Sequence, residues 1–471
     1  MSNNKKIAVL GGGPGGYAAA FLAADKGMNV TLIDSGNKPG GVCLHRGCIP
    51  SKALLHIAHL INETKEAKTW GIDFGEPKID LDGVRNWKNK VIDKMATGLT
   101  QLCKQRKVEF VSAKGNFKDS NNIEANGKLY SFDHCILATG SRPTQPFENI
   151  SHLIDSTNAL ELKSIPKRLL VVGGGYIGLE MGSVYAALGS QVTIVEMMKD
   201  ILPGVDRDLV RPLHHRIKNQ FEEIFLNTKV KDFESKGSKV SVTFENESGV
   251  EHKEFDQALI SIGRRPNTEN IGLDNTKVKL DDKGFVIANS QQKTGDPSIL
   301  AIGDVIGNPM LAHKAAHEAK VAVEVLNGES SDFKNRVIPA VVFTDPEIAW
   351  AGLTENEAQA QGRNVKVAKF PWGASGRAQT LGRGEGLTKL LIDPESERIL
   401  GVGLTGLGAG ELIAEGVLAI QTLVKAKELA LSIHPHPTLS ETMMETAEVF
   451  YGTATHIYKK REHNILKLNN K

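Results

Sequence analysis

Apolar and polar residues along the first part of the chain follow the pattern of a strand, a helix and a second strand. Residues 7–10 are apolar, a glycine-rich turn follows, and residues 17–25 are rich in alanine. A second apolar run at residues 29–33 ends at an acid, Asp34. Short apolar runs joined by a helical stretch are typical of a β-α-β unit, which is therefore predicted here.

The same pattern returns between residues 169 and 196, where Gly173 lies 162 residues after Gly11. Both turns have the spacing G-x-G-x-x-G, whose glycines allow a tight turn, the approach of a pyrophosphate to backbone N–H groups, and close packing of helix on strand. A structural turn is the alternative reading of one copy, but two complete copies indicate two dinucleotide sites. The glycines are Gly11, Gly13 and Gly16 in the first copy and Gly173, Gly175 and Gly178 in the second, and the terminal acids are Asp34 and Glu196.

The remaining segments mix helical and alternating patterns. Residues 83–104 carry apolar side chains at helical spacing, which predicts a helix with its apolar stripe in the core. Asn126-Gly127 marks a hairpin, and residues 240–244 alternate as in a half-buried strand. Beyond residue 343, strand and helix patterns follow one another, so we expect a domain boundary near residue 342 and an α+β C-terminal domain.

Composition and charge exclude several classes of protein. The 471 residues include 57 Lys and Arg against 55 Asp and Glu, and 40% are hydrophobic. At about 100 to 200 residues per domain, this length predicts two to four domains with substantial cores. The balanced charge predicts no nucleic-acid partner and no membrane partner, and no apolar run approaches the roughly 18 residues of a membrane span. No leader is evident after Met1, so we expect a cytoplasmic protein.

Two of the four cysteines, Cys43 and Cys48, lie five positions apart. In a regular helix such residues stand roughly 8 Å apart, too far for a disulfide, so a bridge needs a distorted turn, which Gly47 can supply. Pro50 indicates that a helix starts near Cys48, and a helix N-terminus favours a thiolate there. Redox chemistry is the interpretation we favour; two structural thiols or half of a metal site are the alternatives.

The histidines offer a second candidate site. His434 and His436 alternate with prolines, and from the local sequence a metal pair, simple packing and catalysis by His436 with Glu441 remain open. A further pair, His313 and His317, lacks the glutamate of a zinc-protease motif. We predict no metal site.

Two dinucleotide sites and a candidate dithiol imply a route for electrons. A nicotinamide delivers a hydride and a disulfide takes up two electrons, so a flavin is the natural relay between them. Here the sequence resembles the pyridine-nucleotide-disulfide oxidoreductases over nearly its whole length. The motifs that carry the resemblance are the two glycine turns, C-x-x-x-x-C-x-P-S-K at 43–52, Ala138-Thr139-Gly140, Gly263-Arg264-Arg265-Pro266-Asn267, Gly303-Asp304, and His-Pro-His-Pro-Thr-Leu-Ser-Glu at 434–441.

The resemblance implies an α/β architecture with two Rossmann-like dinucleotide-binding domains and an α+β C-terminal dimerisation domain. The implied ranges are 1–145 for the first part of an FAD-binding domain, 146–272 for an NAD-binding domain, 273–342 for the second, central part of the FAD domain, and 343–471 for the dimerisation or interface domain.

The resemblance also implies the residues that bind the two cofactors. Asp34 contacts the adenosine ribose of FAD, and Asp304 contacts its ribityl chain. Glu196 contacts the ribose of NAD, and an acid there would repel the 2′-phosphate of NADP. Lys52 and Glu180 match a pair near the flavin and nicotinamide, with surface charge as the alternative. The other expected cofactor-binding residues are the glycines of the two turns, Gly140, Gly263 and Ala312.

The catalytic roles follow in the same way. The resemblance implies that Cys48 is a thiolate against the flavin and that Cys43 exchanges with substrate sulfur. It implies that Glu441 orients His436, which takes a proton from a substrate thiol and comes from the partner subunit of a homodimer. The implied reaction is the oxidation of dihydrolipoamide by NAD⁺ through FAD and the Cys43–Cys48 disulfide.

The implied partners are lipoamide or a lipoyl domain, and the acyltransferase core of a 2-oxoacid dehydrogenase complex or the glycine cleavage system. Glutathione-reductase-like chemistry is an alternative, disfavoured by Glu196, and a pure assembly subunit is another, disfavoured by the intact redox residues. Val42 replaces the family's usual Thr and Asp34 its commoner Glu, so we expect weaker or compensated FAD binding.

Overall fold

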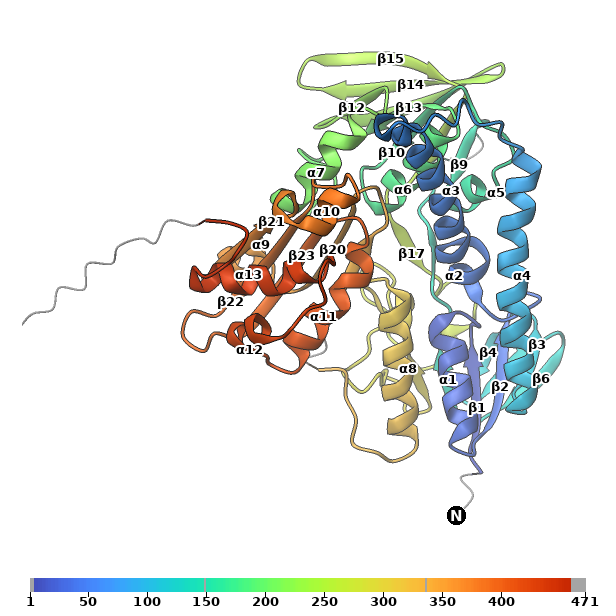
Figure 1. The fold of residues 1–471 in the computed structure, drawn as a ribbon. Helices are drawn as coiled ribbons and strands as arrows, with labels where there is room; N and C mark the ends of the chain where they lie inside the picture. Colours follow the sequence, from blue (N-terminus) through green and yellow to red (C-terminus); the bar gives the residue numbers. More distant parts are fainter. Residues whose placement is uncertain (1–3, 148–149, 335–336, 459–471) are drawn as a thin grey trace, which may run out of the picture. The chain divides into compact units, whose positions relative to one another are not determined.

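The computed structural model describes residues 4–147, 150–334 and 337–458, which form two compact units (Figure 1). Unit 1 comprises Met1–Lys199 and Phe221–Asn335, and unit 2 comprises Asp200–Gln220 and Arg336–Lys471. The segment Asp200–Gln220 lies within the range expected for the NAD-binding domain, yet its contacts group it with the C-terminal unit. Along the described residues, no helix combines the length and the apolar character needed to cross a membrane.

The first Rossmann-like sheet of unit 1 is parallel throughout and has the strand order β18-β7-β1-β2-β3. The predicted β-α-β unit is confirmed as β1 (Lys6–Leu10), α1 (Pro14–Asp25) and β2 (Asn29–Asp34). The other strands are β3 (Glu109–Ser112), β7 (His134–Leu137) and β18 (Ile299–Ala301), and α8 (Ala312–Leu326) packs beside α1.

The second Rossmann-like sheet is also parallel, with the order β12-β11-β10-β16-β9. Its β-α-β unit consists of β10 (Arg168–Val172), α6 (Tyr176–Ala187) and β11 (Gln191–Val195), completed by β9 (Leu153–Asp155), β12 (Glu223–Phe225) and β16 (Gln257–Ile260). Two three-stranded antiparallel sheets adjoin these parallel ones: β4 (Asn116–Asp119), β5 (Asn122–Ala125) and β6 (Lys128–Ser131), and β13 (Lys229–Lys236), β14 (Lys239–Asn246) and β15 (Gly249–Phe255).

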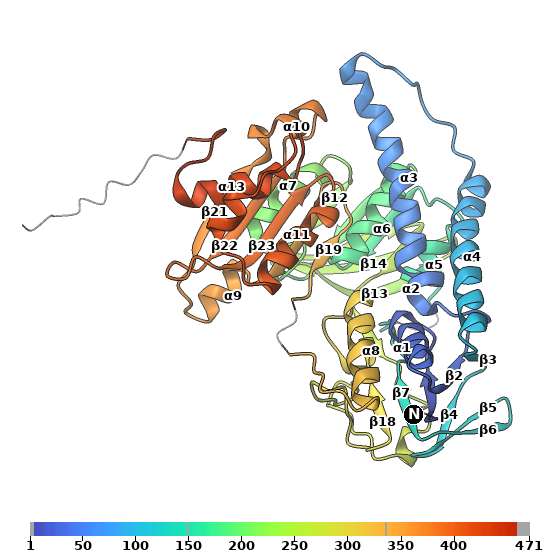
Figure 2. The same ribbon diagram turned by 60° about the horizontal axis from the view of Figure 1, so that its bottom comes forward.

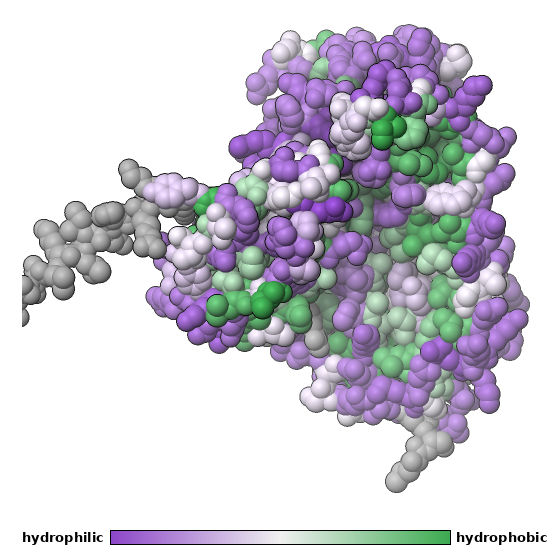
Figure 3. Space-filling model, viewed as in Figure 1, coloured by the Kyte–Doolittle hydropathy of each residue, from purple (hydrophilic) through white to green (hydrophobic). Residues whose placement is uncertain are grey.

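Three helices follow β2: α2 (Gly41–Arg46), α3 (Cys48–Glu66) and α4 (Leu81–Gln105), and α3 and α4 lie side by side (Figure 2). The helix predicted at 83–104 is confirmed as α4. Its stripe is not all core, however, because Trp87 and Met95 are 42% and 45% exposed. Figure 3 shows hydrophobic residues gathered over this part of unit 1. A helix packed on one side only leaves part of a wide apolar stripe uncovered, which periodicity alone does not reveal.

Unit 2 is the predicted α+β domain. Its five-stranded antiparallel sheet has the order β19-β20-β23-β22-β21 and packs against α11 (Ala409–Gln421), α13 (Glu441–Tyr451) and α7 (Arg207–Ile217), while α12 (Ala426–Leu431) contacts α13. Trp372 is fully buried in its core, and a Cβ on Gly386 or Gly406 would lie 2.2–2.3 Å from the indole ring. The strands are β19 (Ala340–Val342), β20 (Glu347–Gly352), β21 (Lys366–Pro371), β22 (Leu387–Ile392) and β23 (Ile399–Gly406).

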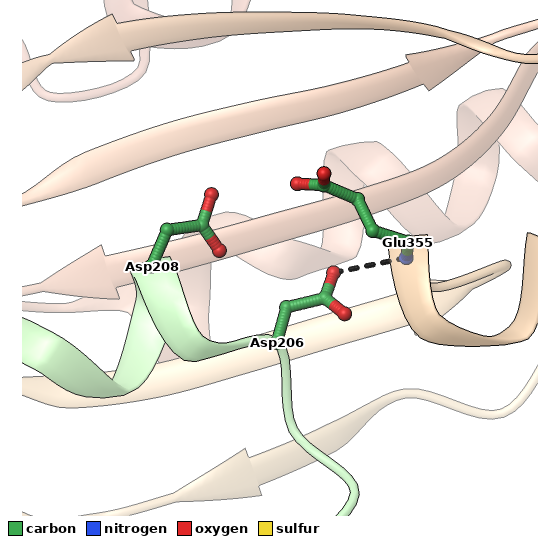
Figure 4. Close-up of side chains that lie close together, drawn as sticks. All are labelled: Asp206, Asp208 and Glu355. Carbon is green, nitrogen blue, oxygen red and sulfur yellow. Dashed lines mark hydrogen bonds between the residues drawn. The ribbon is translucent and has the colours of Figure 1, made fainter. Parts of the chain in front are cut away.

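An acidic cluster joins α7 to the sheet of unit 2 (Figure 4). Asp206, Asp208 and Glu355 are the one group among the described residues with His, Cys or carboxylate atoms close enough for a metal, and Asp206 accepts a hydrogen bond from the Glu355 N–H. Lys389 is 1% exposed and donates to all three carboxylates over 2.6–2.9 Å, while Lys369 contacts Asp208 and Glu355. Two ammonium groups thus offset two of the three negative charges, and the cluster acts as a structural ion-pair network.

Replacing Lys389 by methionine is expected to lower the free energy of unfolding of unit 2 by about 3–5 kcal/mol, because three carboxylates lose their shared buried cation. Urea denaturation followed by tryptophan fluorescence measures this, since Trp372 lies in the same core. Lys366→Met is the matched control, because Lys366 is an exposed lysine on β21. Equal midpoints for the two variants would contradict the assignment.

Candidate active site

A cavity in unit 1 opens where strands of the first sheet reach their carboxyl ends, the usual binding position in α/β folds. It brings together residues that are far apart in the sequence. Its walls include Gly11, Gly13, Asp34, Cys43, Cys48, Ser51, Lys52, Gly140, Ser141, Tyr176, Glu180, Arg264, Asp304 and Ala312. Most of the residues predicted to bind FAD therefore lie around one space.

The second and third glycines of each turn have different structural roles. A Cβ on Gly16 would lie 1.8 Å from the Gly11 oxygen, and a Cβ on Gly178 would lie 2.1 Å from the Gly173 oxygen, so these positions need glycine for packing. The middle glycines, Gly13 and Gly175, cap α1 and α6, and a Cβ there meets nothing closer than 4.0 Å. The open space at both helix N-termini fits a dinucleotide pyrophosphate at each turn.

The acids at the ends of β2 and β11 hold the glycine turns. Asp34 accepts hydrogen bonds from the N–H groups of Gly12 and Gly36, at 2.5 and 2.7 Å. Glu196 does the same for Gly174 and Met198, at 2.7 and 2.8 Å. Both acids are thus fixed beside the turns, where a ribose would bind next to the pyrophosphate; the ribose contact itself stays a prediction.

The distorted turn between the two cysteines is present. Helix α2 ends at Arg46, Gly47 has φ −148° and ψ −113°, and α3 begins at Cys48. A Cβ on Gly47 would lie 3.0 Å from the Val42 oxygen and 3.3 Å from the Cys43 Cα, so glycine permits the close return of the chain. The break brings the Cys43 and Cys48 side chains within hydrogen-bonding reach, both as free thiols.

The two thiols differ in acidity. A hydrogen bond from Cys43, assisted by the charge of Lys52, lowers the pKa of Cys48 to about 7, against the opposing effects of burial and Glu180. The hydrogen bond to Cys48, burial and the negative charge of Cys48 raise the pKa of Cys43. Cys48 is therefore the thiolate of the reduced pair near neutral pH, and Cys43 keeps its proton.

We expect the reduced protein to gain one thiolate as the pH rises through about 7, because Cys48 ionises there. Thiolate absorbance near 240 nm against pH measures this, and the step should vanish in Cys48→Ser. Lys52→Met should move the midpoint upward, because the variant lacks the nearby cation. A midpoint that stays in place in Lys52→Met would contradict the role given to this lysine.

Lys52 and Glu180 form an ion pair within unit 1, as the family resemblance implies. Lys52 Nζ lies 2.8 Å from Glu180 Oε2, and Glu180 is 3% exposed. Ser51 also donates to Glu180 Oε2, over 3.0 Å. The carboxylate is thus buried and paired, which excludes the alternative of a solvated surface charge. Sequence reasoning missed Ser51, although it stands beside Lys52 in the same motif.

Asp304 reaches the cavity from a short 3-10 helix, Gly303–Ile306. Ser141 Oγ donates to Asp304 Oδ2 over 2.5 Å, and Arg264 Nε donates to Ser141 Oγ over 2.7 Å. Neither Ser141 nor Arg264 was predicted as a site residue, although each follows a predicted glycine directly. Those neighbours, Gly140 and Gly263, both have positive φ, and Gly140 lines the cavity.

The His436 dyad lies in unit 2. Glu441 Oε1 pairs with His436 Nδ1 at 2.9 Å, and Glu441 Oε2 accepts from the Thr438 N–H at 2.8 Å. Burial raises the pKa of Glu441, but the Thr438 N–H and the His436 ring outweigh it, so the pKa lies below its ordinary value. The His436 side chain is 71% exposed, which leaves the imidazole accessible to a substrate.

His434 has a different partner, which favours packing over a metal pair for this residue. Its Nε2 lies 2.8 Å from Glu415 Oε1, and its Nδ1 lies 2.9 Å from the Ser432 oxygen, so both ring nitrogens are engaged. The side chain is 8% exposed. His434 is therefore a packed residue that fixes the loop.

Comparison with known proteins identifies the family. Residues 5–319 match the pyridine nucleotide-disulphide oxidoreductase model, and residues 338–447 match the dimerisation domain of the same family. The chain belongs to the pyridine nucleotide-disulphide oxidoreductases. The family uses FAD and NAD(H), and its dimerisation domain supports a homodimer.

Similar proteins cover the chain almost from end to end. It is 46% identical to a dihydrolipoyl dehydrogenase of Vibrio cholerae over 96% of both chains, and 42% identical to that of Geobacillus stearothermophilus over 96% of this chain and 97% of the relative. Among solved structures, LpdA of Mycobacterium tuberculosis has a TM-score of 0.87 at 27% identity, covering 94% of this chain and 99% of that one. The flavoprotein disulfide reductase RclA of Escherichia coli has a TM-score of 0.85 at 25% identity, covering 95% and 99%.

Proposed function

We propose that the chain is a dihydrolipoyl dehydrogenase, which oxidises dihydrolipoamide with NAD⁺ to give lipoamide, NADH and a proton. The observation that carries the proposal is the thiol pair: Cys43 and Cys48 line the same cavity as the first glycine turn and Asp304. Relatives that share 41–46% of their residues with this chain over about 96% of its length bear this enzyme name.

In the proposed reaction, the oxidised enzyme carries a Cys43–Cys48 disulfide. A dihydrolipoamide thiolate attacks Cys43 Sγ, forms a mixed disulfide and releases Cys48 as a thiolate. The second substrate sulfur then attacks the mixed disulfide, releases Cys43 and leaves as part of lipoamide. The low pKa of Cys48 makes it the better leaving group, which suits this order. FAD, when bound, supplies the two-electron transfer from the reduced pair to NAD⁺.

His436 is the proposed base for the substrate thiols, oriented by Glu441 through its Nδ1. The exposed ring fits a role toward a substrate that reaches it from outside unit 2. We propose, as the resemblance implies, that this histidine serves the active site of the partner subunit in the homodimer.

The proposed cofactor positions follow the two glycine turns. The turn from Gly11 to Gly16, with Asp34 and Asp304, would hold FAD, and the turn from Gly173 to Gly178, with Glu196, would hold NAD. Glu196 is 7% exposed and already accepts two backbone N–H groups, so a 2′-phosphate would have to displace a fixed carboxylate. NAD is therefore the proposed nicotinamide cofactor. We further propose a cytoplasmic enzyme that docks on the acyltransferase core of a 2-oxoacid dehydrogenase complex or serves glycine cleavage.

The test is an anaerobic titration of the holoenzyme with NADH, followed by visible spectroscopy. We expect a long-wavelength thiolate-to-flavin band after transfer of two electrons, and reoxidation by lipoamide. NADPH in place of NADH should be a poor reductant. Bleaching of the flavin without this band, or reoxidation by glutathione disulfide but not by lipoamide, would overturn the proposal.

A further inference from the structure

A buried ion pair lies beneath the turn that carries Asp304. Lys314 and Glu318 are one helical turn apart on α8, their side chains are 7% and 2% exposed, and 2.7 Å separates Lys314 Nζ from Glu318 Oε1. Charged side chains are rarely buried to this degree unless they are paired. Neither residue takes part in the chemistry proposed above, so the pair needs a separate explanation.

The pair binds both ends of the turn. Glu318 Oε2 accepts a hydrogen bond from the Gly303 N–H over 2.8 Å, and Lys314 Nζ donates to the Gly307 oxygen over 3.4 Å. Gly303 has a φ of +78°, a conformation that favours glycine. A carboxylate therefore fixes the first residue of the turn, an ammonium group fixes the residue just after it, and the two charges are joined to each other.

Stabilisation of α8 does not explain the pair. Lys314 is the third residue of the helix, in the first turn, where the helix dipole disfavours a cation. The order Lys then Glu at positions i and i+4 is also the less favourable order in a helix. Burial raises the pKa of Glu318, and nearby Asp304 adds to this, while Lys314 and the Gly303 N–H oppose it. The charges thus stand in an unfavourable place for the helix itself.

The turn that the pair contacts runs along the cavity. Asp304 follows Gly303 directly and lines the cavity, where Ser141 holds its Oδ2 atom. Ala312 and Ala315, on the same turn of α8 as Lys314, line the cavity as well. A change at Glu318 would therefore reach the cavity through the Gly303 N–H, without any change in the side chains that line it.

We propose that Lys314 and Glu318 are positioning residues for the flavin, which clamp the two ends of the turn at residues 303–307 and so set the position of the Asp304 carboxylate. The proposal rests on the proposed function, in which Asp304 contacts FAD. Because the clamp carries two opposite charges close to the cavity, it also balances the electrostatic potential beside the bound flavin.

The test compares variants by FAD affinity and by flavin midpoint potential at pH 8. Glu318→Ala removes the acceptor for Gly303, and we expect it to weaken FAD binding to the apoenzyme at least tenfold. Glu318→Gln keeps an acceptor but loses the charge, so its FAD affinity should stay within about threefold of the parent. It leaves the Lys314 cation unbalanced, which favours the more negative reduced flavin and shifts the potential upward. Lys314→Met should shift the potential in the opposite direction.

The matched control is Glu324→Ala, on the same helix, where the Glu324 side chain accepts a hydrogen bond from nearby Ser331. We expect it to keep the parent's FAD affinity and potential. Glu318→Ala with unchanged FAD affinity, or potential shifts of the same sign in Glu318→Gln and Lys314→Met, would overturn the clamp. Should Glu318→Ala not fold, the opposite shifts of the other two variants still decide. Asp304→Asn separates the two proposals. If Asp304→Asn weakens FAD binding but Glu318→Ala does not, the clamp fails. If neither Asp304→Asn nor Glu318→Ala weakens FAD binding, the proposed FAD site fails.

Discussion

Cys48→Ser is expected to lower kcat for NADH-dependent lipoamide reduction by about 10⁴-fold or more, because neither the disulfide nor the low-pKa thiolate can form. The variant should still bind FAD, since its cavity keeps the first glycine turn and Asp304. Steady-state kinetics and the anaerobic NADH titration measure the two effects. The long-wavelength band should be absent at every stage of the titration.

Cys43→Ser distinguishes the roles of the two sulfur atoms. It should be as inactive as Cys48→Ser toward lipoamide, yet keep a Cys48 thiolate and therefore show a long-wavelength band without reduction. Cys103→Ala is the control for cysteine replacement in general, because Cys103 is buried in the core beside the first sheet. A Cys48→Ser enzyme that retains more than a few per cent of the parent's activity, or a band that survives in it, would contradict the proposed relay.

His436→Gln is expected to lower kcat/KM for dihydrolipoamide by about 10²–10⁴-fold, the range for loss of a general base. The band in the NADH titration should persist, because the redox pair is untouched. Glu441→Gln should lower kcat/KM less than His436→Gln does, since it keeps the imidazole ring but loses the charge that orients the ring. Stopped-flow reduction by dihydrolipoamide and reduction by NADH, measured separately, locate the defect in the substrate half of the reaction.

The control for His436 stands two residues away. His434→Gln removes a histidine from the same loop, but that histidine is engaged with Glu415 and the Ser432 oxygen. We expect it to alter stability more than catalysis, with kcat/KM within about tenfold of the parent. An enzyme in which His434→Gln is as damaging as His436→Gln would show that the loop as a whole, rather than one imidazole, is required.

Most of the architecture can be predicted from local patterns in the sequence. A β-α-β unit lies within about 30 consecutive residues, and its apolar periods and glycine spacing depend on neighbours in the chain, so both units were predicted closely. The break at Gly47 and the helix start at Cys48 were predictable for the same reason, because turn geometry is a local property. The family resemblance added the roles of residues whose motifs are equally local.

Contacts between distant residues depended instead on the folded chain. Ser51 reaches Glu180, 129 positions away, and Lys389 is buried among acids from two other segments, although lysines are among the residues least often buried. The stripe on α4 was expected in the core, but Trp87 remains exposed because a helical period does not say how much of the stripe a neighbour covers. The pair Lys314 and Glu318 is a further example. Its spacing along α8 is visible in the sequence, but its hydrogen bonds to Gly303 and Gly307 form only when α8 packs against the 3-10 helix Gly303–Ile306.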